Sequence, residues 1–234
     1  MFRTLIQRAG QALPSQCAVC RTWPTAQPVC EACVADFAQP EPRCQTCALP
    51  VLGGVTRCGE CVLHPPPLDA CLSAVGYGFP WQDLVTDFKF RDNPGWADLF
   101  ALLLNSMHGV DAALAQADLV LPVPLGKTRL RERGYNQALE LAQALEPGKT
   151  HAHLLLRIND TPPQSLLDRV ARLNDVKDAF AVDPLRIEHI RGKSIVLVDD
   201  VMTTGATLYA AARTLRAAGA AHITGLVFAR TDRE

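Results

Sequence analysis

The sequence lacks a strong net charge, a long hydrophobic segment and a high content of aromatic residues. Its 234 residues carry a formal net charge of −1, and Phe, Trp and Tyr together make up 6%. A nearly neutral chain has no bulk electrostatic attraction for nucleic acid or a membrane surface, so any charged ligand must be recognised locally. Beyond the N-terminal region, the most apolar stretch is Phe100 to Leu104, which is far too short to span a bilayer.

The first residues also lack the apolar core of a signal peptide. Residues 1–17 contain two arginines but no apolar run of the required length. We therefore expect a cytoplasmic protein without membrane insertion. A reducing compartment disfavours structural disulfides, which matters for the interpretation of the nine cysteines.

Eight of the nine cysteines form four CxxC pairs, separated by nine, ten and ten residues. Two such pairs provide the four thiolates of a tetrahedral zinc site. We expect two structural sites, paired in sequence order because this needs only short hairpins, with a cross-braced pairing as the alternative. A repeated redox motif is disfavoured, and an iron–sulfur cluster is the main alternative. Cys71 is interpreted as a small buried hydrophobe. The predicted ligands are Cys17, Cys20, Cys30 and Cys33 for one site, and Cys44, Cys47, Cys58 and Cys61 for the other.

The pattern of the chain changes near residue 70. Residues 17–67 are rich in Cys and Pro, whereas later segments alternate between predicted strands and predicted helices. This alternation predicts an α/β fold with a parallel sheet flanked by helices. The run His64-Pro-Pro-Pro suggests a stiff linker, so we expect a zinc module over residues 1–66 and a larger domain over residues 67–234. The predicted strands begin at Cys71, Asp118, Ser194 and His222, and the predicted helices cover 81–90, 96–107, 135–145 and 206–218.

The most informative segment follows the predicted strand at residues 194–199. Two carboxylates are followed by a loop of small and hydroxyl residues that opens a helix, where backbone N–H groups favour an anion. The carboxylates suit sugar hydroxyls or Mg²⁺. A helix cap with acidic neighbours explains one Asp or Thr but not the whole string, and the lysine of a P-loop is absent. The candidate residues are Asp199, Asp200, Val201, Met202, Thr203, Thr204, Gly205, Ala206 and Thr207.

Two further polar segments precede this one. The first carries four cations within seven residues, Lys127, Arg129, Arg131 and Arg133, after a buried strand. Arginine forks suit phosphate oxygens, although a solvated basic face is the alternative. The second, residues 157–180, suits a lid over a bound substrate or, alternatively, a surface helix. Its candidate residues are Gln164, Arg169, Arg172 and Asn174.

The string VLVDDVMTTGAT resembles the signature of type I phosphoribosyltransferases that binds phosphoribosyl pyrophosphate (PRPP). The resemblance implies that Asp199 and Asp200 face the ribose hydroxyls and the Mg²⁺ shell, and that residues 203–207 cradle the 5′-phosphate. With PVPLGKTRLRERGYNQ, TPPQSLLDRVARLNDVKDAF and a double zinc ribbon, the chain is similar to the ComF family of competence-associated proteins. That similarity assigns the four cations to a pyrophosphate loop, and Gln164, Arg169, Arg172 and Asn174 to a mobile loop.

The family resemblance implies a role in natural transformation, on or near incoming single-stranded DNA. One interpretation is a phosphoribosyltransferase that uses PRPP, Mg²⁺ and an unidentified nitrogen acceptor. The other is a non-catalytic adaptor that senses PRPP or binds single-stranded DNA and recruits competence or recombination partners. No Ser-His-Asp or Cys-His grouping is evident, so no catalytic base is assigned. The importance of Arg129 and Arg133 distinguishes the transferase from the adaptor, because 5′-phosphate binding alone would depend little on these two arginines.

The purified protein should contain two zinc ions per chain, because each expected site uses four thiolates and is closed to other ligands. Elemental analysis of the purified protein measures this directly. Far fewer than two zinc ions per chain, together with no iron, would contradict the metal-site interpretation.

Overall fold

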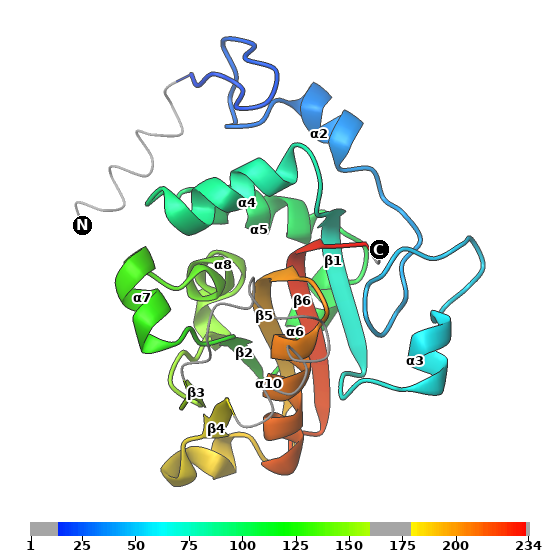
Figure 1. Ribbon diagram of the computed structural model, residues 1–234, viewed down its shortest axis with the longest axis vertical. Helices are drawn as coiled ribbons and strands as arrows, with labels where there is room; N and C mark the ends of the chain where they lie inside the picture. The colour runs from blue at the N-terminus through cyan, green and yellow to red at the C-terminus, as the bar shows by residue number, and fades with distance from the viewer. Residues whose placement is uncertain (1–13, 160–178, 233–234) are drawn as a thin grey trace. The chain divides into compact units, whose positions relative to one another are not determined.

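The computed structural model describes residues 14–159 and 179–232. Packing separates two compact units, Met1–Pro40 and Glu41–Glu234. The smaller unit contains helix α2 (Glu31–Phe37) and the first four cysteines. Figure 1 shows the elements of the larger unit in sequence colours. Among the described helices, none is both long enough and apolar enough to cross a membrane.

The second cysteine group belongs to the larger unit. Cys44 and Cys47 are buried in the same hydrophobic cluster as Leu68 and Cys71, beyond the proline run. The main-chain N–H of Cys71 also donates to the carbonyl of Gln45 at 2.8 Å. Helix α3 (Gly59–Leu63) completes this segment. The division by packing therefore falls at residue 40, whereas the sequence suggested a linker near residue 66.

A four-stranded parallel sheet forms the centre of the larger unit. Its strands are β1 (Ala70–Gly76), β6 (His222–Arg230), β5 (Ser194–Met202) and β2 (Leu119–Pro122), in that spatial order. Near-continuous apolar runs in β2, β5 and β6 suit strands that are covered on both faces. The predicted α/β fold with a parallel sheet is confirmed. A separate antiparallel pair joins β3 (Leu155–Arg157) and β4 (Phe180–Val182).

Helices cover both faces of the sheet (Figure 1). A Cβ added to Gly225 of β6 would meet Leu208 of α10, whereas Phe228, three residues later, contacts Phe100 of α5. Since side chains alternate along a strand, α10 and α5 lie on opposite faces. Helix α8 packs on β5 and β2. The helices are α4 (Trp81–Phe90), α5 (Trp96–Asn105), α6 (Val110–Gln116), α7 (Lys127–Arg133), α8 (Gln137–Leu145) and α10 (Ala206–Ala217), with 3₁₀ turns at Pro147–Lys149 and Pro184–His189.

A buried aromatic cluster fixes α4 and α5 to the sheet. The rings of Phe100 and Phe228 stack with centroids 3.8 Å apart, and Trp81 meets Phe228 edge-on at 5.7 Å. Phe88 meets Phe100 edge-on at 5.4 Å. Such ring pairs each add about 0.5–1.5 kcal/mol beyond the burial of their area. The cluster thereby holds the last turn of α4, which carries Lys89, beside the end of β5.

Substitution of Gly225 by Ala should destabilise the larger unit. The added Cβ would lie 2.7 Å from Leu208 Cδ2 and 3.2 Å from both Cys71 Sγ and Leu68 Cδ1. Overpacking of this kind costs about 1–3 kcal/mol and should lower Tm by several degrees in thermal unfolding. Gly53→Ala is the matched control, because nothing lies within 4 Å of its added Cβ. Equal melting of the two variants would contradict the close approach of α10 to β6.

Candidate functional site

A cavity of about 220 Å³ opens at the carboxyl ends of β5 and β2, where open parallel sheets bind ligands. It joins the loop before α10 to the segment after β2, to the last turn of α4 and to the end of β3. The lining consists of residues 199–208, residues 123–125, residues 136–138, Arg129, Arg133, Arg157, Lys89 and Tyr77.

The loop between β5 and α10 is shaped by Gly205, whose φ is +84°. A Cβ there would lie 2.6 Å from Met202 Cε and 2.7 Å from the ring of Tyr209, so the position requires glycine for both backbone and space. The hydroxyl of Thr204 accepts a hydrogen bond from the N–H of Ala206 at 3.3 Å. Thr203 and Thr207 line the cavity beside it. The loop thus presents hydroxyls and the N-terminal end of a 12-residue helix to the cavity.

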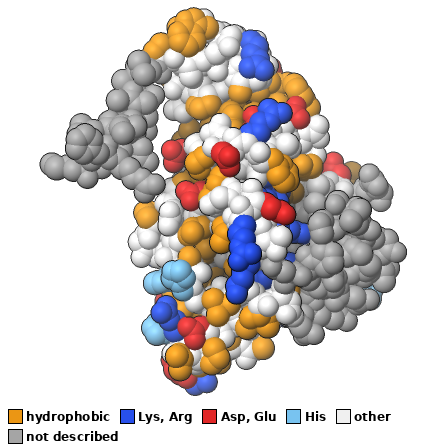
Figure 2. Space-filling view, turned by 60° about the vertical axis from the view of Figure 1, so that its left-hand side comes forward, with side chains coloured by type: hydrophobic (Ala, Val, Ile, Leu, Met, Phe, Trp, Pro, Cys, Tyr) orange, Lys and Arg blue, Asp and Glu red, His pale blue; other side chains and the backbone are white. Residues whose placement is uncertain are grey.

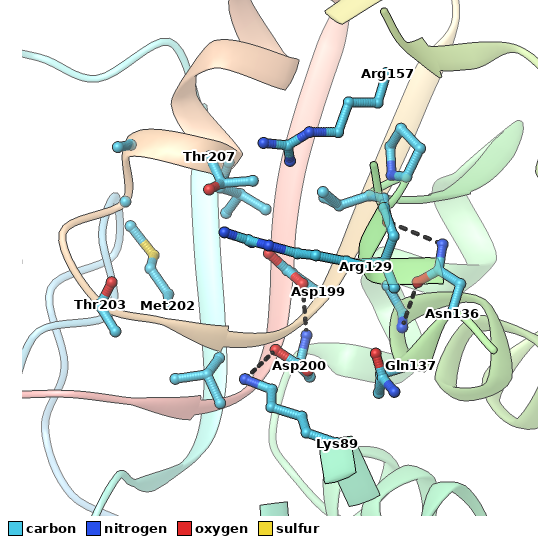
Figure 3. A pocket seen from close by; sticks show the side chains of 18 of the residues that line it. Lys89, Arg129, Asn136, Gln137, Arg157, Asp199, Asp200, Met202, Thr203 and Thr207 are labelled. Carbon is cyan, nitrogen blue, oxygen red and sulfur yellow. Dashed lines mark hydrogen bonds and ion pairs between the residues drawn. The ribbon is translucent and has the colours of Figure 1, made fainter. Parts of the chain in front are cut away.

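The two adjacent aspartates have different surroundings. Asp200 is 6% exposed and pairs with Lys89, whose Nζ lies 3.0 Å from Asp200 Oδ1. Asp199 lines the cavity, and its Oδ1 accepts the main-chain N–H of Asp200 at 2.9 Å. Figure 3 shows Lys89 reaching Asp200 from one side while Asp199 faces the arginines on the other. One carboxylate is therefore neutralised within the protein, and the other faces the ligand space.

Burial and the neighbouring charge of Asp200 raise the pKa of Asp199 to about 7, and the charge of Lys89 opposes this shift. At neutral pH a substantial fraction of Asp199 is protonated. A cation placed beside it would favour the ionised form. Binding of a cation next to Asp199 is therefore favoured, because the cation stabilises the ionised carboxylate.

Three arginines line the cavity together with Asp199. In Figure 3, Arg129 and Arg157 extend towards the space next to Asp199 and Thr207. The third, Arg133, donates from Nη1 to Gln137 Oε1 at 3.0 Å, and its guanidinium lies 5.0 Å from the ring centroid of Phe90. Burial lowers the pKa of Arg133, and the charge of Asp200 opposes that shift. These contacts orient a cation that remains available to an anionic ligand.

The start of α8 ties the surrounding segments together. Asn136 caps the helix by accepting the N–H of Ala138 at 3.1 Å, and its Nδ2 donates to the carbonyl of Val123 at 3.1 Å. Gln137, only 1% exposed, donates to the carbonyl of Phe88 at 3.4 Å. The hydroxyl of Tyr135 donates to the same carbonyl. The segment after β2 is thereby fixed to α4.

The expected pyrophosphate segment is helical rather than an open loop, since residues 127–133 form α7. This helix brings Arg129 and Arg133 to the cavity, whereas Lys127 and Arg131 are not among the described lining residues. Gln164, Arg169, Arg172 and Asn174 lie outside the described residues. Sequence reasoning missed Lys89 and Arg157, because no local pattern marks a single cation in a helix or a short strand as part of a distant site.

The eight CxxC cysteines come together in the two groups expected from their order: Cys17, Cys20, Cys30 and Cys33, then Cys44, Cys47, Cys58 and Cys61. Within each group the Sγ atoms all lie within 4.8 Å of one another. Cys20 Sγ and Cys30 Sγ lie 3.6 Å apart in the first group, and Cys47 Sγ and Cys58 Sγ lie 3.7 Å apart in the second. A tetrahedron with Zn–S bonds of about 2.3 Å has edges of about 3.8 Å, so both groups fit zinc.

Main-chain donors in both groups support thiolates. The N–H of Cys30 donates to Cys17 Sγ at 3.4 Å, and the N–H of Cys58 donates to Cys44 Sγ at 3.3 Å. Burial acts to raise the pKa of Cys44, but the main-chain donors lower it to about 6. Burial raises the pKa of Cys47 to about 11. Four thiols packed this closely cannot all ionise without a cation, which zinc supplies when bound.

Comparison with known proteins shows one matching domain family and several relatives that match most of the chain. Residues 133–233 match the phosphoribosyl transferase domain family. The chain is 32% identical over 228 residues to the DNA utilization protein YhgH of Salmonella typhimurium, covering 94% of this chain and 98% of the relative. It is 32% identical over 173 residues to competence protein F of Haemophilus influenzae, covering 71% and 75% of the two chains. It is 36% identical over 149 residues to competence protein ComFC of Bacillus subtilis, covering 64% and 59%.

Substitution of Asp199 by Asn should raise the Tm of the ligand-free protein at pH 8, and raise it less at pH 5. The pKa is raised to about 7 in the folded protein, against about 3.9 for an unperturbed Asp. The unfolded chain therefore releases its proton first, and wild-type stability falls as pH rises from about 4 to about 7. Asn avoids this loss, so we expect a gain of a few degrees at pH 8 in thermal unfolding without Mg²⁺.

The exposed Asp98, converted to Asn, is the control for that measurement. It should change Tm by a similar small amount at both pH values. If the effect of Asp199→Asn were identical at pH 5 and pH 8, Asp199 would not have the raised pKa.

Proposed function

Since the chain belongs to the ComF family of competence-associated proteins, we propose that it acts in natural transformation and binds PRPP with Mg²⁺ in the cavity at the end of β5. One observation carries the ligand proposal: a glycine-shaped loop, Asp199 and three arginines line a single cavity. A ribose that carries phosphate at one end and pyrophosphate at the other could use all of these groups.

The 5′-phosphate is assigned to the loop before α10. Thr203, Thr204 and Thr207 supply hydroxyls, and the N-terminus of α10 supplies backbone donors and a favourable dipole. Gly205 gives the loop its shape, because most residues do not adopt its positive φ. A side chain at this position would already collide with Met202 and Tyr209.

The pyrophosphate is assigned to the arginines that line the cavity. The cavity is lined by Lys89, Arg129, Arg133 and Arg157 against the two carboxylates Asp199 and Asp200. Lys89 pairs with Asp200, and the lining as a whole holds four cations against two carboxylates, of which Asp199 has a raised pKa. This excess of positive charge suits a polyanion, and guanidinium forks suit phosphate oxygens.

Mg²⁺ fits beside Asp199. A carboxylate whose burial raises its pKa gains from a hard cation, and oxygen donors are the ligands that Mg²⁺ takes. When bound, Mg²⁺ would balance charge on the pyrophosphate group of the ligand. The residues of the chain would do the rest, since Asp199 accepts hydrogen bonds from the ribose hydroxyls and the arginines hold the pyrophosphate.

The reaction for which this arrangement is suited is phosphoribosyl transfer. The bond from C1 of the ribose to the pyrophosphate oxygen breaks, and its electron pair leaves with pyrophosphate. A nitrogen of the acceptor forms the new bond to C1 and releases a proton to solvent. Arg129 and Arg133 would stabilise the departing charge, and the transfer as written needs no covalent nucleophile.

The alternative role is an adaptor that binds the 5′-phosphate of single-stranded DNA without catalysis. The names of the relatives refer to DNA utilization and to competence. Figure 2 shows one face on which Lys and Arg are interspersed with Asp, Glu and apolar side chains. The described residues of that face thus form no broad basic surface of the kind that tracks a nucleic-acid backbone. Binding of DNA on that face would therefore depend on the terminal phosphate.

Calorimetric titration of PRPP with and without Mg²⁺ tests the proposal. Wild type should bind in a Mg²⁺-dependent manner, and Arg133→Ala should weaken PRPP binding about tenfold or more. The same variant should change the affinity for ribose 5-phosphate by no more than about threefold, because that ligand lacks the pyrophosphate. Arg213→Ala, on the exposed side of α10, should leave both affinities unchanged.

Two outcomes would contradict the proposal. Folded, zinc-loaded wild type that fails to bind PRPP would reject the ligand, and binding of a 5′-phosphorylated oligonucleotide would then favour the adaptor. Equal PRPP affinity of wild type and Arg133→Ala would reject the assignment of the pyrophosphate.

A further inference from the structure

A buried arginine at the end of β6 links the second cysteine group to the loop before α10. Arg230 is 3% exposed. Its Nε donates to the carbonyl of Cys47 at 2.9 Å, and its Nη1 donates to the carbonyls of Met202 at 2.9 Å and of Thr203. Nη1 also reaches the carbonyl of Thr231 at 2.9 Å. A guanidinium is costly to bury, so these main-chain acceptors hold it in one place.

We propose that Arg230 is a positioning residue that couples a metal-bound cysteine segment to the phosphate-binding loop before α10. This segment, called the knuckle below, carries the second cysteine group, Cys44, Cys47, Cys58 and Cys61. This inference rests on the proposed function, because it concerns the loop to which the 5′-phosphate is assigned. Nothing about Arg230 requires contact with the ligand, and it is not among the described residues that line the cavity.

The direction of the peptide groups explains how Arg230 would act on the loop. In a trans peptide the carbonyl and the N–H of the next residue point in opposite directions. Arg230 binds the carbonyls of Met202 and Thr203, so the N–H groups of Thr203 and Thr204 point away from it. Both threonines line the cavity. Arg230 therefore fixes the orientation of backbone donors that an anion would use.

The other end of the link depends on the cysteine knuckle. The carbonyl of Cys47 belongs to a CxxC turn in which the N–H of Ala48 donates to the carbonyl of Cys44 at 2.8 Å. Arg43 donates to the carbonyl of Ala48 at 2.9 Å. The only helix in this segment is the five-residue α3. Four thiolates around one metal are the main restraint on such a turn, and without the metal the Cys47 carbonyl would lose its fixed position.

The knuckle and the loop also share a packed core. Cys71 Sγ lies 3.8 Å from Met202 Sδ, and both residues are 2% exposed. The N–H of Thr231 donates to the carbonyl of Met202 at 3.1 Å, which keeps the ends of β5 and β6 together. A change in the knuckle would thus reach the loop before α10 over a short distance, through the side chain of Arg230 and the end of β6. The first cysteine group lies in the other compact unit.

Substitution of Arg230 is the first test. Arg230→Ala should weaken binding of both ribose 5-phosphate and PRPP–Mg²⁺ about tenfold or more, since two charged hydrogen bonds to the loop are lost. Arg230→Lys keeps the charge but cannot span the Cys47 and Met202 carbonyls, so its affinity should fall in between. Amide hydrogen exchange at Thr203 and Thr204 should accelerate in both variants.

A destabilised but unrelated variant separates positioning from general instability. Val110→Ala, at a fully buried position of α6, should lower Tm without changing ligand affinity or loop exchange. If wild type binds neither ligand, the proposed function fails. If wild type binds but the Arg230 variants bind equally well with unchanged exchange, the positioning role is wrong and the proposed function stands.

Removal of one metal at a time is the second test. Cys30→Ser and Cys58→Ser are matched, because each residue is the N-cap of a short helix and a ligand of one cysteine group. Each should lower the zinc content by one ion per chain, but only Cys58→Ser should weaken ribose 5-phosphate binding and accelerate exchange in the loop. Equal effects of the two variants, or full affinity of folded Cys58→Ser, would overturn the link. If Cys58→Ser does not fold, the Arg230 variants decide the question.

Discussion

The hydrogen-bonded register of β5 against β6 runs from Ser194 opposite His222 to Met202 opposite Arg230, and the position of the phosphate loop follows from it. Because β5 also pairs with β2, the segments after β5 and β2 emerge at the same edge of the sheet. That edge receives the threonines from one side and the arginines from the other. A parallel sheet makes such convergence automatic, since every strand delivers its carboxyl end to one side.

Charge is concentrated at this edge at a cost in stability. Asp200 is buried with Lys89, while Asp199 has a raised pKa, which means that its ionised form is disfavoured in the free protein. Trp81 and Phe88 of α4 pack edge-on against the stacked rings of Phe228 and Phe100, which holds α4 against the sheet. Apolar packing in the interior thus offsets an electrostatically unfavourable rim, as is common where a site is prepared for a charged ligand.

The sequence was most informative where a pattern is local. The CxxC spacing predicts both cysteine groups, and the apolar run before Asp199 predicts β5, although the strand continues to Met202 because its pairing with β6 continues. Helix α7 was missed since it buries no residue and shows no apolar periodicity. Lys89 could not be assigned to the site, because only tertiary packing brings α4 to β5. Likewise, the proline run suggested a domain boundary near residue 66. Packing of the second cysteine group with the larger unit places the division at residue 40.

The main-chain hydrogen bond from Cys71 to the carbonyl of Gln45 affects the solubility of the protein. Strand β1 is at the edge of the sheet, and its outer side is where another polypeptide would add by strand pairing. The knuckle occupies part of that side in the folded protein. Loss of the metal would expose this edge. The metal-free chain would then self-associate through β1 and lose solubility, whether or not it could still bind a ligand.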